Sequence, residues 1–514
     1  NALDANTVGG KNVALGMDAL GTNIDGSRSV AVGDSALAAQ EPASAVDMYN
    51  TAVGHGAGSA VSTGVQNTII GGLSGDALTT ANNSVAVGYN ALSTNTVSAG
   101  NVAVGKDALA TFNVGSGSGY NTAVGAVAGG AVTTGIKNTL VGGLAGDALT
   151  DADYNVALGY EALTADTLGS NNIAIGAFAL RDQNFTTATN SYNIGVGYEA
   201  GGSITTGVQN TLIGGLAGDA ITTGDDNVAV GTYALSADTL GSKSIAIGRF
   251  ALYAQNFTTA TDTYNVGVGH NAGAAVTTGQ YNTLIGGLAG DALTSSSENV
   301  AVGYLALSAA TTGDGNTAIG VKAMDANTVG DRNVAVGADA LGAMNPATNA
   351  DMYNTAVGYS AGAAVTTGIN NTLIGGLAGD ALTTGNNHVV LGVKALTSEV
   401  LGSASVAIGY SALEAQNMGA NTESFNVAVG FKSGESVTTG IRNTILGGEA
   451  GDALTDADDN VAVGSLALSA DTLGSKSTAI GRGALKTQNF TTATDSYNTA
   501  VGYSAGELVT TGTA

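Results

Sequence analysis

Two short acidic runs contain the side chains best suited to binding a metal ion. One holds Asp151 and Asp153, and the other holds Asp456, Asp458 and Asp459. Carboxylate oxygens spaced in this way are the ligands that calcium prefers, but calcium takes about six to eight oxygens. Neither run supplies that number by itself. We therefore predict no cofactor, and calcium is the ion that these weak candidates would favour.

A second acidic pattern is the segment GGLAGDAL, which resembles part of a calcium-binding nonapeptide. It recurs at intervals and not in tandem, so the neighbouring half-site of that motif is missing. Its aspartates are therefore expected to be solvated turn residues. They are Asp147, Asp219, Asp291, Asp380 and Asp452.

The chain offers few groups for catalysis. It has no cysteine and only three histidines, and it lacks a nucleophile elbow, a phosphate loop and an HExxH motif. The run aliphatic-Gly-x-x-Ala matches the hexapeptide of left-handed β-helix acyltransferases. Only one such run is present per repeat, however, and no repeated histidine offers a general base. We predict that the protein is not an enzyme.

Aromatic residues in recurring long segments are the best candidates for contacting a partner. A row of them would bind a glycan or receptor through many weak contacts. The alternative, favoured because aromatic burial is stabilising, is that they pack the long segments onto the body of the protein. The candidate surface-contact residues are Phe185, Phe257, Phe490, Tyr192, Tyr264 and Tyr497.

Repeats position all of these residues. The string Asn-x-small-aliphatic-Gly ends at 28 glycines along the 514 residues, mostly 17 apart, with a step of 20 or 21 every fourth unit. Four units form a module of 72 residues, and one module has an extra unit near 304–320. We predict one continuous repeat domain over 1–514, a fragment of a longer fibre.

Aligned on that glycine, the columns have physical meanings. The fourth residue before it is asparagine in 22 units, which predicts a hydrogen-bonded ladder at a stacked turn. A threonine column eight residues after the glycine favours a second turn ladder over an ice-binding face. Representatives of the asparagine ladder are Asn12, Asn50, Asn121, Asn193, Asn265 and Asn498.

Each unit is too short for a helix, and its alternation indicates strands. Two short strands and two turns per 17 residues describe one coil of a parallel β-solenoid. The predicted fold is therefore an all-β solenoid of about 28 coils, roughly 130 Å long at about 4.8 Å per coil. Both strand faces are apolar, as in Val102 to Val104, and a coil this narrow encloses only one of them. The other face would form an apolar stripe, which indicates an oligomer.

The units NVAVGKDAL and SIAIGRFAL resemble the head repeats of trimeric autotransporter adhesins, the YadA-like head. The resemblance covers essentially the whole chain and implies a left-handed parallel β-roll, with three rolls packed about a threefold axis. Arrays such as NTAVGYSAG are also similar to those of phage tail fibres. The 17-residue coils and the GGLAGDAL unit depart from the usual adhesin pattern.

The charge and hydropathy of the chain argue against two kinds of partner, nucleic acids and membranes. Lys and Arg total 15 against 40 Asp and Glu, a net charge of −25, so nucleic-acid binding is not expected. The sequence contains no stretch of 18 apolar residues, so membrane insertion is not expected. The predicted function is a non-enzymatic extracellular fibre or adhesin that projects from a cell surface, self-associates as a homotrimer and mediates attachment. The alternatives are a phage tail-fibre shaft and a self-assembling surface filament.

Overall fold

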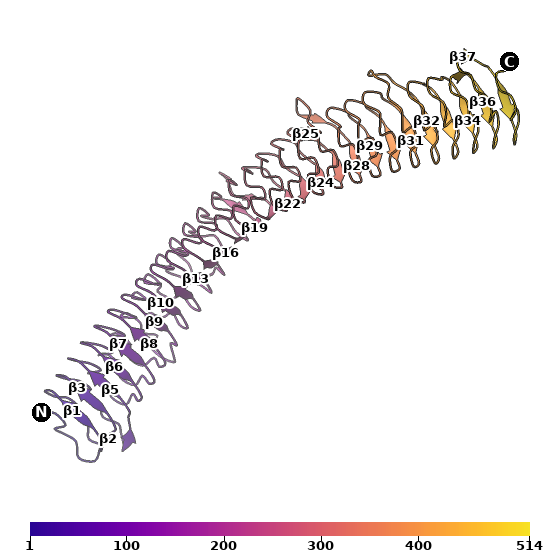
Figure 1. The fold of residues 1–514 in the computed structure, drawn as a ribbon. Helices are drawn as coiled ribbons and strands as arrows, with labels where there is room; N and C mark the ends of the chain where they lie inside the picture. Colours follow the sequence, from indigo (N-terminus) through magenta and orange to yellow (C-terminus); the bar gives the residue numbers. More distant parts are fainter. Residues whose placement is uncertain (514) are drawn as a thin grey trace. The chain divides into compact units, whose positions relative to one another are not determined.

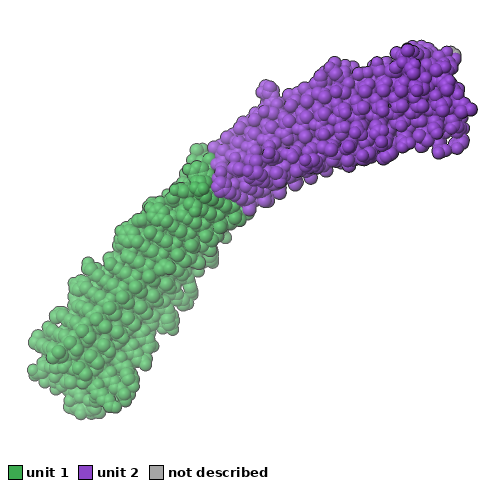
Figure 2. All heavy atoms as spheres, viewed as in Figure 1, with its two compact units in different colours: residues 1–263 green, residues 264–514 purple. Residues whose placement is uncertain are grey.

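The computed structural model describes residues 1–513, and they form an all-β parallel β-solenoid of about 29 turns spaced by about 17 residues. No helix occurs within this range. The chain folds as two compact units, Asn1–Thr263 and Tyr264–Ala514 (Figure 2). In each unit, successive coils stack with one short strand arrow per coil (Figure 1). That the repeats form one continuous domain stays a prediction.

Each coil contributes one three-residue strand to the main sheet. The segment after the repeat glycine, which the sequence predicts as a second short strand, forms turns, so that prediction is wrong. In the first unit these strands are β1 (Val13–Leu15), β3 (Val30–Val32), β5 (Thr51–Val53), β6 (Thr68–Ile70), β7 (Val85–Val87), β8 (Val102–Val104), β9 (Thr122–Val124), β10 (Thr139–Val141), β11 (Val156–Leu158), β13 (Ile173–Ile175), β15 (Ile194–Val196), β16 (Thr211–Ile213), β17 (Val228–Val230) and β19 (Ile245–Ile247). In the second unit they are β21 (Val266–Val268), β22 (Thr283–Ile285), β23 (Val300–Val302), β24 (Thr317–Ile319), β26 (Val334–Val336), β28 (Thr355–Val357), β29 (Thr372–Ile374), β30 (Val389–Leu391), β31 (Val406–Ile408), β32 (Val427–Val429), β33 (Thr444–Leu446), β34 (Val461–Val463), β36 (Thr478–Ile480) and β38 (Thr499–Val501).

Ten two-residue strands form five small parallel pairs beside the main sheet. Each pair joins a short coil to the long coil that follows it, where the extra residues of the long coil extend the turn. The pairs are β2 (Gly26–Ser27) with β4 (Val46–Asp47), β12 (Gly169–Ser170) with β14 (Thr189–Asn190), β18 (Gly241–Ser242) with β20 (Thr261–Asp262), β25 (Gly330–Asp331) with β27 (Ala350–Asp351), and β35 (Gly474–Ser475) with β37 (Thr494–Asp495).

The pairing register follows the sequence repeat. In β7 and β8, Val85 pairs with Val102 and Val87 with Val104, a step of one 17-residue coil. The Val85 N–H donates to the Asn101 carbonyl at 2.8 Å, and the same bond recurs from coil to coil. Because every coil pairs in parallel with its neighbours, a side chain at one position lies above its equivalent in the next coil.

The middle residue of each strand faces the core. Ala103 is completely buried, whereas Val102 and Val104 on either side of it are half-buried. The alternation of a pleated strand therefore sends the small residue inward and the two larger residues outward. The interior face, which the sequence pattern left open, is thus the alanine face.

The core is filled in two alternative ways at the turn after the strand. Where the fourth residue after the repeat glycine is leucine, as at Leu163, that side chain fills the core and the seventh residue is polar in most coils, as at Asp166. Where the fourth residue is Gly146, the seventh is Leu149. A Cβ on Gly146 would meet Leu149 Cδ1 at 2.8 Å, so the two sites share one volume. The coil types alternate without overfilling this space.

The predicted asparagine column forms a hydrogen-bonded ladder that is buried except at its two ends, Asn12 and Asn498. Asn193 Oδ1 accepts the N–H of Asn210 at 2.9 Å, and Asn193 Nδ2 donates to the Gly207 carbonyl at 2.7 Å. The other representatives at Asn12, Asn50, Asn121 and Asn265 accept the equivalent N–H of the next coil, and Asn498 Nδ2 donates to the Gly512 carbonyl.

The threonine column is also internal to the fold. Thr205 Oγ1 donates to the Thr222 carbonyl at 3.2 Å, and Thr222 Oγ1 donates to the Thr239 carbonyl at 3.0 Å. These hydroxyls join successive coils and are not presented as a free row. The interpretation as a turn ladder is therefore confirmed at these positions.

Candidate functional site

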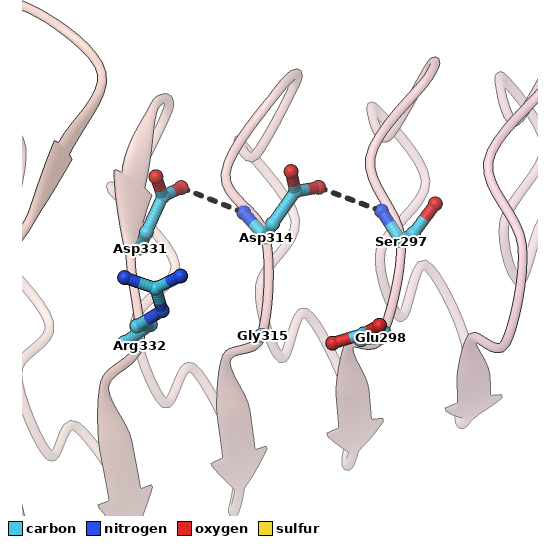
Figure 3. Close-up of a pocket in the computed structure, with 6 residues that line it drawn as sticks. All are labelled: Ser297, Glu298, Asp314, Gly315, Asp331 and Arg332. Atoms are coloured by element: carbon cyan, nitrogen blue, oxygen red, sulfur yellow. Dashed lines mark hydrogen bonds between the residues drawn. The ribbon is translucent and has the colours of Figure 1, made fainter.

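A small hollow of about 210 Å³ opens on the turn edge that precedes the strands (Figure 3). It exists because Gly315 has no side chain, which leaves a gap between Glu298 on the preceding coil and Arg332 on the following one. The hollow lies beside the extra coil of its module. Its lining residues are Ser297, Glu298, Asp314, Gly315, Asp331 and Arg332.

The polar groups of this hollow are used mainly to join coils. The Ser297 N–H donates to Asp314 Oδ1 at 2.7 Å, and the Asp314 N–H donates to Asp331 Oδ1 at 2.7 Å (Figure 3). Arg332 forms an ion pair with Asp351 on the next coil. Desolvation raises the pKa of Asp331, and the nearby carboxylates of Asp314 and Asp351 raise it further. The six lining residues include no nucleophile paired with a base.

The first predicted acidic run also lies at this edge. Asp151 Oδ1 accepts a hydrogen bond from the Thr134 hydroxyl at 2.6 Å, and Asp153 Oδ1 accepts one from the Ile136 N–H at 2.7 Å. Both carboxylates therefore bind the preceding coil, 17 residues back. This contact gives each aspartate a structural use that needs no ion.

The second acidic run repeats this arrangement. Asp456 accepts from the Thr439 hydroxyl at 2.5 Å, and Asp458 accepts from the Ile441 N–H at 2.8 Å. Asp459 forms a two-bond ion pair with Arg442, and this hydrogen bonding lowers its pKa. Among residues 1–513, no group of three or more His, Cys, Asp or Glu side chains is placed to hold a metal ion.

The GGLAGDAL aspartates differ from the solvated turn residues that the sequence predicts. Asp147 accepts a hydrogen bond from Thr164 on the next coil. In four other copies one carboxylate oxygen is buried and, within the described residues, has no hydrogen-bond partner, so the prediction is wrong for that atom. These are Asp219, Asp291, Asp380 and Asp452, and the same holds for Asp76. Burial raises the pKa of Asp219 to about 6.

The predicted phenylalanines lie inside the long loops. Phe185, Phe257 and Phe490 are only 5–6% exposed, which agrees with the favoured alternative that they pack the long loops onto the body and contradicts their use as surface contacts. The Phe185 N–H donates to Asp166 Oδ1 at 3.2 Å, and a Cβ on Gly169 would meet the Phe185 ring at 2.9 Å. The ring covers the Gly169 backbone and fastens the long loop to the preceding coil.

The predicted tyrosines lie outside. Tyr192, Tyr264 and Tyr497 are 49–57% exposed on the turn edge, in the column immediately before the asparagine ladder. Lys476 Nζ lies 5.3 Å from the centre of the Tyr497 ring, and the Tyr264 ring stacks on that of Tyr281 at 5.9 Å. All three rings face solvent, so their use in surface contact stays a prediction.

A further set of exposed and half-buried aromatic side chains was not predicted. Phe178 contacts Tyr160 at a centroid distance of 5.7 Å and Tyr198 at 5.9 Å, both edge to face. Similar contacts join Tyr233, Phe250 and Tyr253, and Tyr410 with Phe431. All of these residues except Tyr253 occupy the first or second position after the repeat glycine. Counting aromatics in those columns would have revealed them.

The outward face of the main sheet is uncharged and largely aliphatic, with threonine in part of one column. The residue before the repeat glycine is valine, isoleucine or leucine in all 28 coils, and the residue two before that is valine, isoleucine or threonine. Ile213 and Ile247 are each 39% exposed there, and Leu391 is 46% exposed. Neither column contains a charged residue, so the acidic excess of the chain lies elsewhere.

No protein-family model matches the chain, and no curated protein is significantly similar to it. Within residues 1–513, the structure contains no helix with the length and apolar character needed to cross a membrane. The structure alone therefore identifies the chain as a β-solenoid repeat protein.

Proposed function

We propose that the chain is part of a non-enzymatic extracellular fibre, an adhesin shaft or head that projects from a cell surface and mediates attachment. The observation that carries the proposal is the uncharged, largely aliphatic face of the main sheet. It runs along each unit, and it consists of side chains that are neither buried in the coil nor charged. Extended apolar surfaces of this kind mark interfaces.

The size of this face suits an interface between copies of the chain. Fourteen strands of one unit at about 4.8 Å each, and three residues wide at about 3.3 Å each, give roughly 650 Å² per unit. Standard interfaces bury about 800 Å² per partner, so the face of a single unit supplies most of that area. The resemblance of the repeats to YadA-like heads favours three copies, so we propose a homotrimer.

Attachment would use the exposed aromatic side chains. Tyr192 in the first unit and Tyr497 in the second present rings to solvent from the column before the asparagine ladder, and Tyr160, which contacts Phe178, is also exposed. Each contact with a glycan or receptor would be weak, but repetition along the fibre raises the overall affinity. The buried Phe185 takes no part in this contact.

The oligomer is tested by light scattering on the purified chain. We expect a mass three times the 49.8 kDa of one chain. The double variant Ile213→Lys and Ile247→Lys places charges on the outward face and should lower the mass to that of one chain. The control Gln209→Lys lies in the same coil as Ile213 but on the exposed turn edge, where the column already holds lysine at Lys243. It should leave the trimer intact.

A wild-type mass of one chain at all concentrations would overturn the homotrimer. Electron microscopy of the same sample separates the alternatives, because end-to-end polymers would favour a self-assembling filament. The repeats are also similar to those of phage tail fibres. Attachment of the purified fibre to bacterial cells, with loss after aromatic substitution, would favour that tail-fibre function.

A further inference from the structure

Three long loops carry the same tripeptide, Asn-Phe-Thr, which fits the acceptor pattern Asn-x-Ser/Thr for N-linked sugar. The asparagines are Asn184, Asn256 and Asn489, each eight residues after a repeat glycine. In the first unit, Asn184 and Asn256 are 72 residues apart, which is four coils or roughly 19 Å along the stack. The tripeptide therefore occupies one structural position three times.

The loop holds this tripeptide in a form that exposes both reactive ends. Asn184 and Thr186 are exposed, whereas Phe185 between them is buried. The same pattern of exposed, buried and exposed residues recurs at 256–258 and 489–491. The phenylalanine anchors the backbone, and the flanking asparagine and threonine project into solvent, where a bulky group on the asparagine has room.

Contacts of the asparagine leave its nitrogen edge open. Asn184 Oδ1 lies 3.0 Å from the Thr167 hydroxyl of the preceding coil. Asn256 Oδ1 is 3.0 Å from Thr239 Oγ1, and Asn489 Oδ1 is 3.0 Å from Thr472 Oγ1. These contacts hold the amide by its oxygen, and within the described residues Nδ2 makes no hydrogen bond.

Two other Asn-x-Ser/Thr tripeptides provide an internal comparison. In the first, Asn82 Oδ1 accepts the Val65 N–H at 2.8 Å, and Ser84 is 1% exposed. In the second, Asn370 Nδ2 donates to Asn387 Oδ1 at 3.3 Å, and Thr372 is the first residue of β29. Both place the hydroxyl residue in or against the sheet ladder, so the fold uses these tripeptides structurally.

We propose that Asn184, Asn256 and Asn489 are acceptor sites for N-linked glycosylation. The sugar donor would be an oligosaccharide carried on a lipid diphosphate, delivered by a transferase. Asn Nδ2 bonds to the anomeric carbon and loses a proton, and the anomeric C–O bond breaks as the lipid diphosphate leaves with its electron pair. No oxidation or reduction occurs. Neither the trimer nor the attachment function is required for this modification.

The test uses the full chain secreted from a eukaryotic cell line. The purified protein is treated with peptide-N-glycosidase in heavy-oxygen water, which converts each glycosylated asparagine to labelled aspartate, and peptide masses locate the label. We expect label at Asn184, Asn256 and Asn489 and none at Asn82 or Asn370. In mass spectra of the intact secreted protein, each substitution that removes one acceptor site should lower the mass by that of one glycan.

Substitutions at the threonine separate the sequon from the fold. Thr186→Ala should abolish the label at Asn184 alone, and Thr186→Ser should retain it, because the hydroxyl is kept. Absence of label at all three Asn-Phe-Thr sites in the secreted protein would overturn the proposal. Equal labelling of Asn82 and Asn370 would also overturn it, because the loop geometry would then confer no preference.

Discussion

At the scale of single residues, the coil depends on backbone conformations that most residues avoid. In the coil around Gly159, Tyr154, Glu161 and Leu163 all have positive φ, between 52° and 58°. Such left-handed residues cost on the order of 1–3 kcal/mol each. The same three columns are left-handed in nearly every coil, because the turns must bring the chain back above its own start. Hydrogen bonds between coils offset this cost.

The paired glycines of the GGLAGDAL coils give a sharp test of this backbone requirement. Gly214 has φ of +135°, and a Cβ there would meet the carbonyl of Gly231 at 2.6 Å, whereas nothing lies within 4 Å of a Cβ on Gly215. We expect Gly214→Ala to lower the free energy of unfolding by at least about 1–3 kcal/mol. The adjacent control Gly215→Ala should change it little. Urea denaturation measures both, and equal effects would contradict the requirement.

The raised pKa of Asp219 predicts a pH dependence of stability. Its pKa rises from 3.8 to about 6, chiefly by burial and also by the Glu199 carboxylate. The folded chain therefore holds this proton more tightly than the unfolded chain. The stability from this group is full below 3.8 and is lost as the pH rises towards about 6.

Asp219→Asn should remove that loss, so urea denaturation at a series of pH values should give a flatter profile for the variant than for the wild type. Asp147→Asn is the matched control in the equivalent position, where Thr164 donates to the carboxylate. If the profile of Asp219→Asn matched that of the wild type between 3.8 and about 6, burial of this carboxyl would not affect stability.

At the scale of elements, the long loop is a short coil with an anchored insertion. Gln183 Nε2 donates to Asp166 Oδ2 at 2.6 Å, and Asp166 Oδ1 accepts the N–H groups of Gly169 and Phe185. Burial raises the pKa of Asp166. The buried carboxyl thus organises the loop by accepting several hydrogen bonds at once. Asp238 with Gln255, and Asp471 with Gln488, repeat the arrangement.

Removal of the Phe185 ring should free the long loop from the preceding coil and leave the stacking of the coils intact. Core Phe→Ala substitutions cost about 3–5 kcal/mol, and we expect Phe185→Ala to lie near the lower end because the coil below it is intact. Limited proteolysis should cut the variant within 184–191 much faster than the wild type. Thr187→Ala, in the exposed part of the same loop, is the control. Unchanged cleavage of Phe185→Ala would exclude the anchoring function.

The sequence predicts the periodic elements well and the exceptions poorly. Seventeen-residue spacing and an obligatory glycine are sufficient for the parallel coil, because every coil repeats the same contacts. The sequence does not show which aromatic side chain is buried, because burial depends on how the loop folds over the coil. Phe185 and Tyr192 lie in one loop, yet the ring of Phe185 is buried and that of Tyr192 is exposed to solvent. The buried oxygen of Asp219 is equally hidden from sequence, because GGLAGDAL reads as an ordinary polar turn.

At the scale of the molecule, strand pairing joins each coil only to its neighbours, so stability is approximately a sum over coils and their interfaces. The extra coil of one module illustrates the consequence. β24 (Thr317–Ile319) pairs with β23 on one side and β26 on the other in the same register as the rest of the second unit. A whole coil can therefore enter the stack without changing the strand pairing or its register.

Deletion of residues 304–320 should accordingly be tolerated. The cut removes one 17-residue repeat and joins Gly303 to Val321, which restores the sequence pattern of a normal coil. We expect a β-rich circular dichroism spectrum and cooperative unfolding. Deletion of 304–312 removes half a coil, so the strands that follow no longer pair in register with those that precede them. We expect this protein to be aggregated or unfolded. Equal behaviour of the two deletions would contradict repeat-by-repeat stability.

The direction of the hydrogen bonds between coils determines how each unit responds to a pulling force. The bonds of the ladder, such as Val85 N–H to the Asn101 carbonyl, point along the stack. Tension along the stack therefore loads the hydrogen bonds of one coil interface after another, in series. It does not load all of the bonds together in shear. Each released coil supplies 17 residues, or roughly 55–60 Å of extended chain. A unit of this kind would lengthen by even steps under load and would dissipate a sudden force one coil at a time.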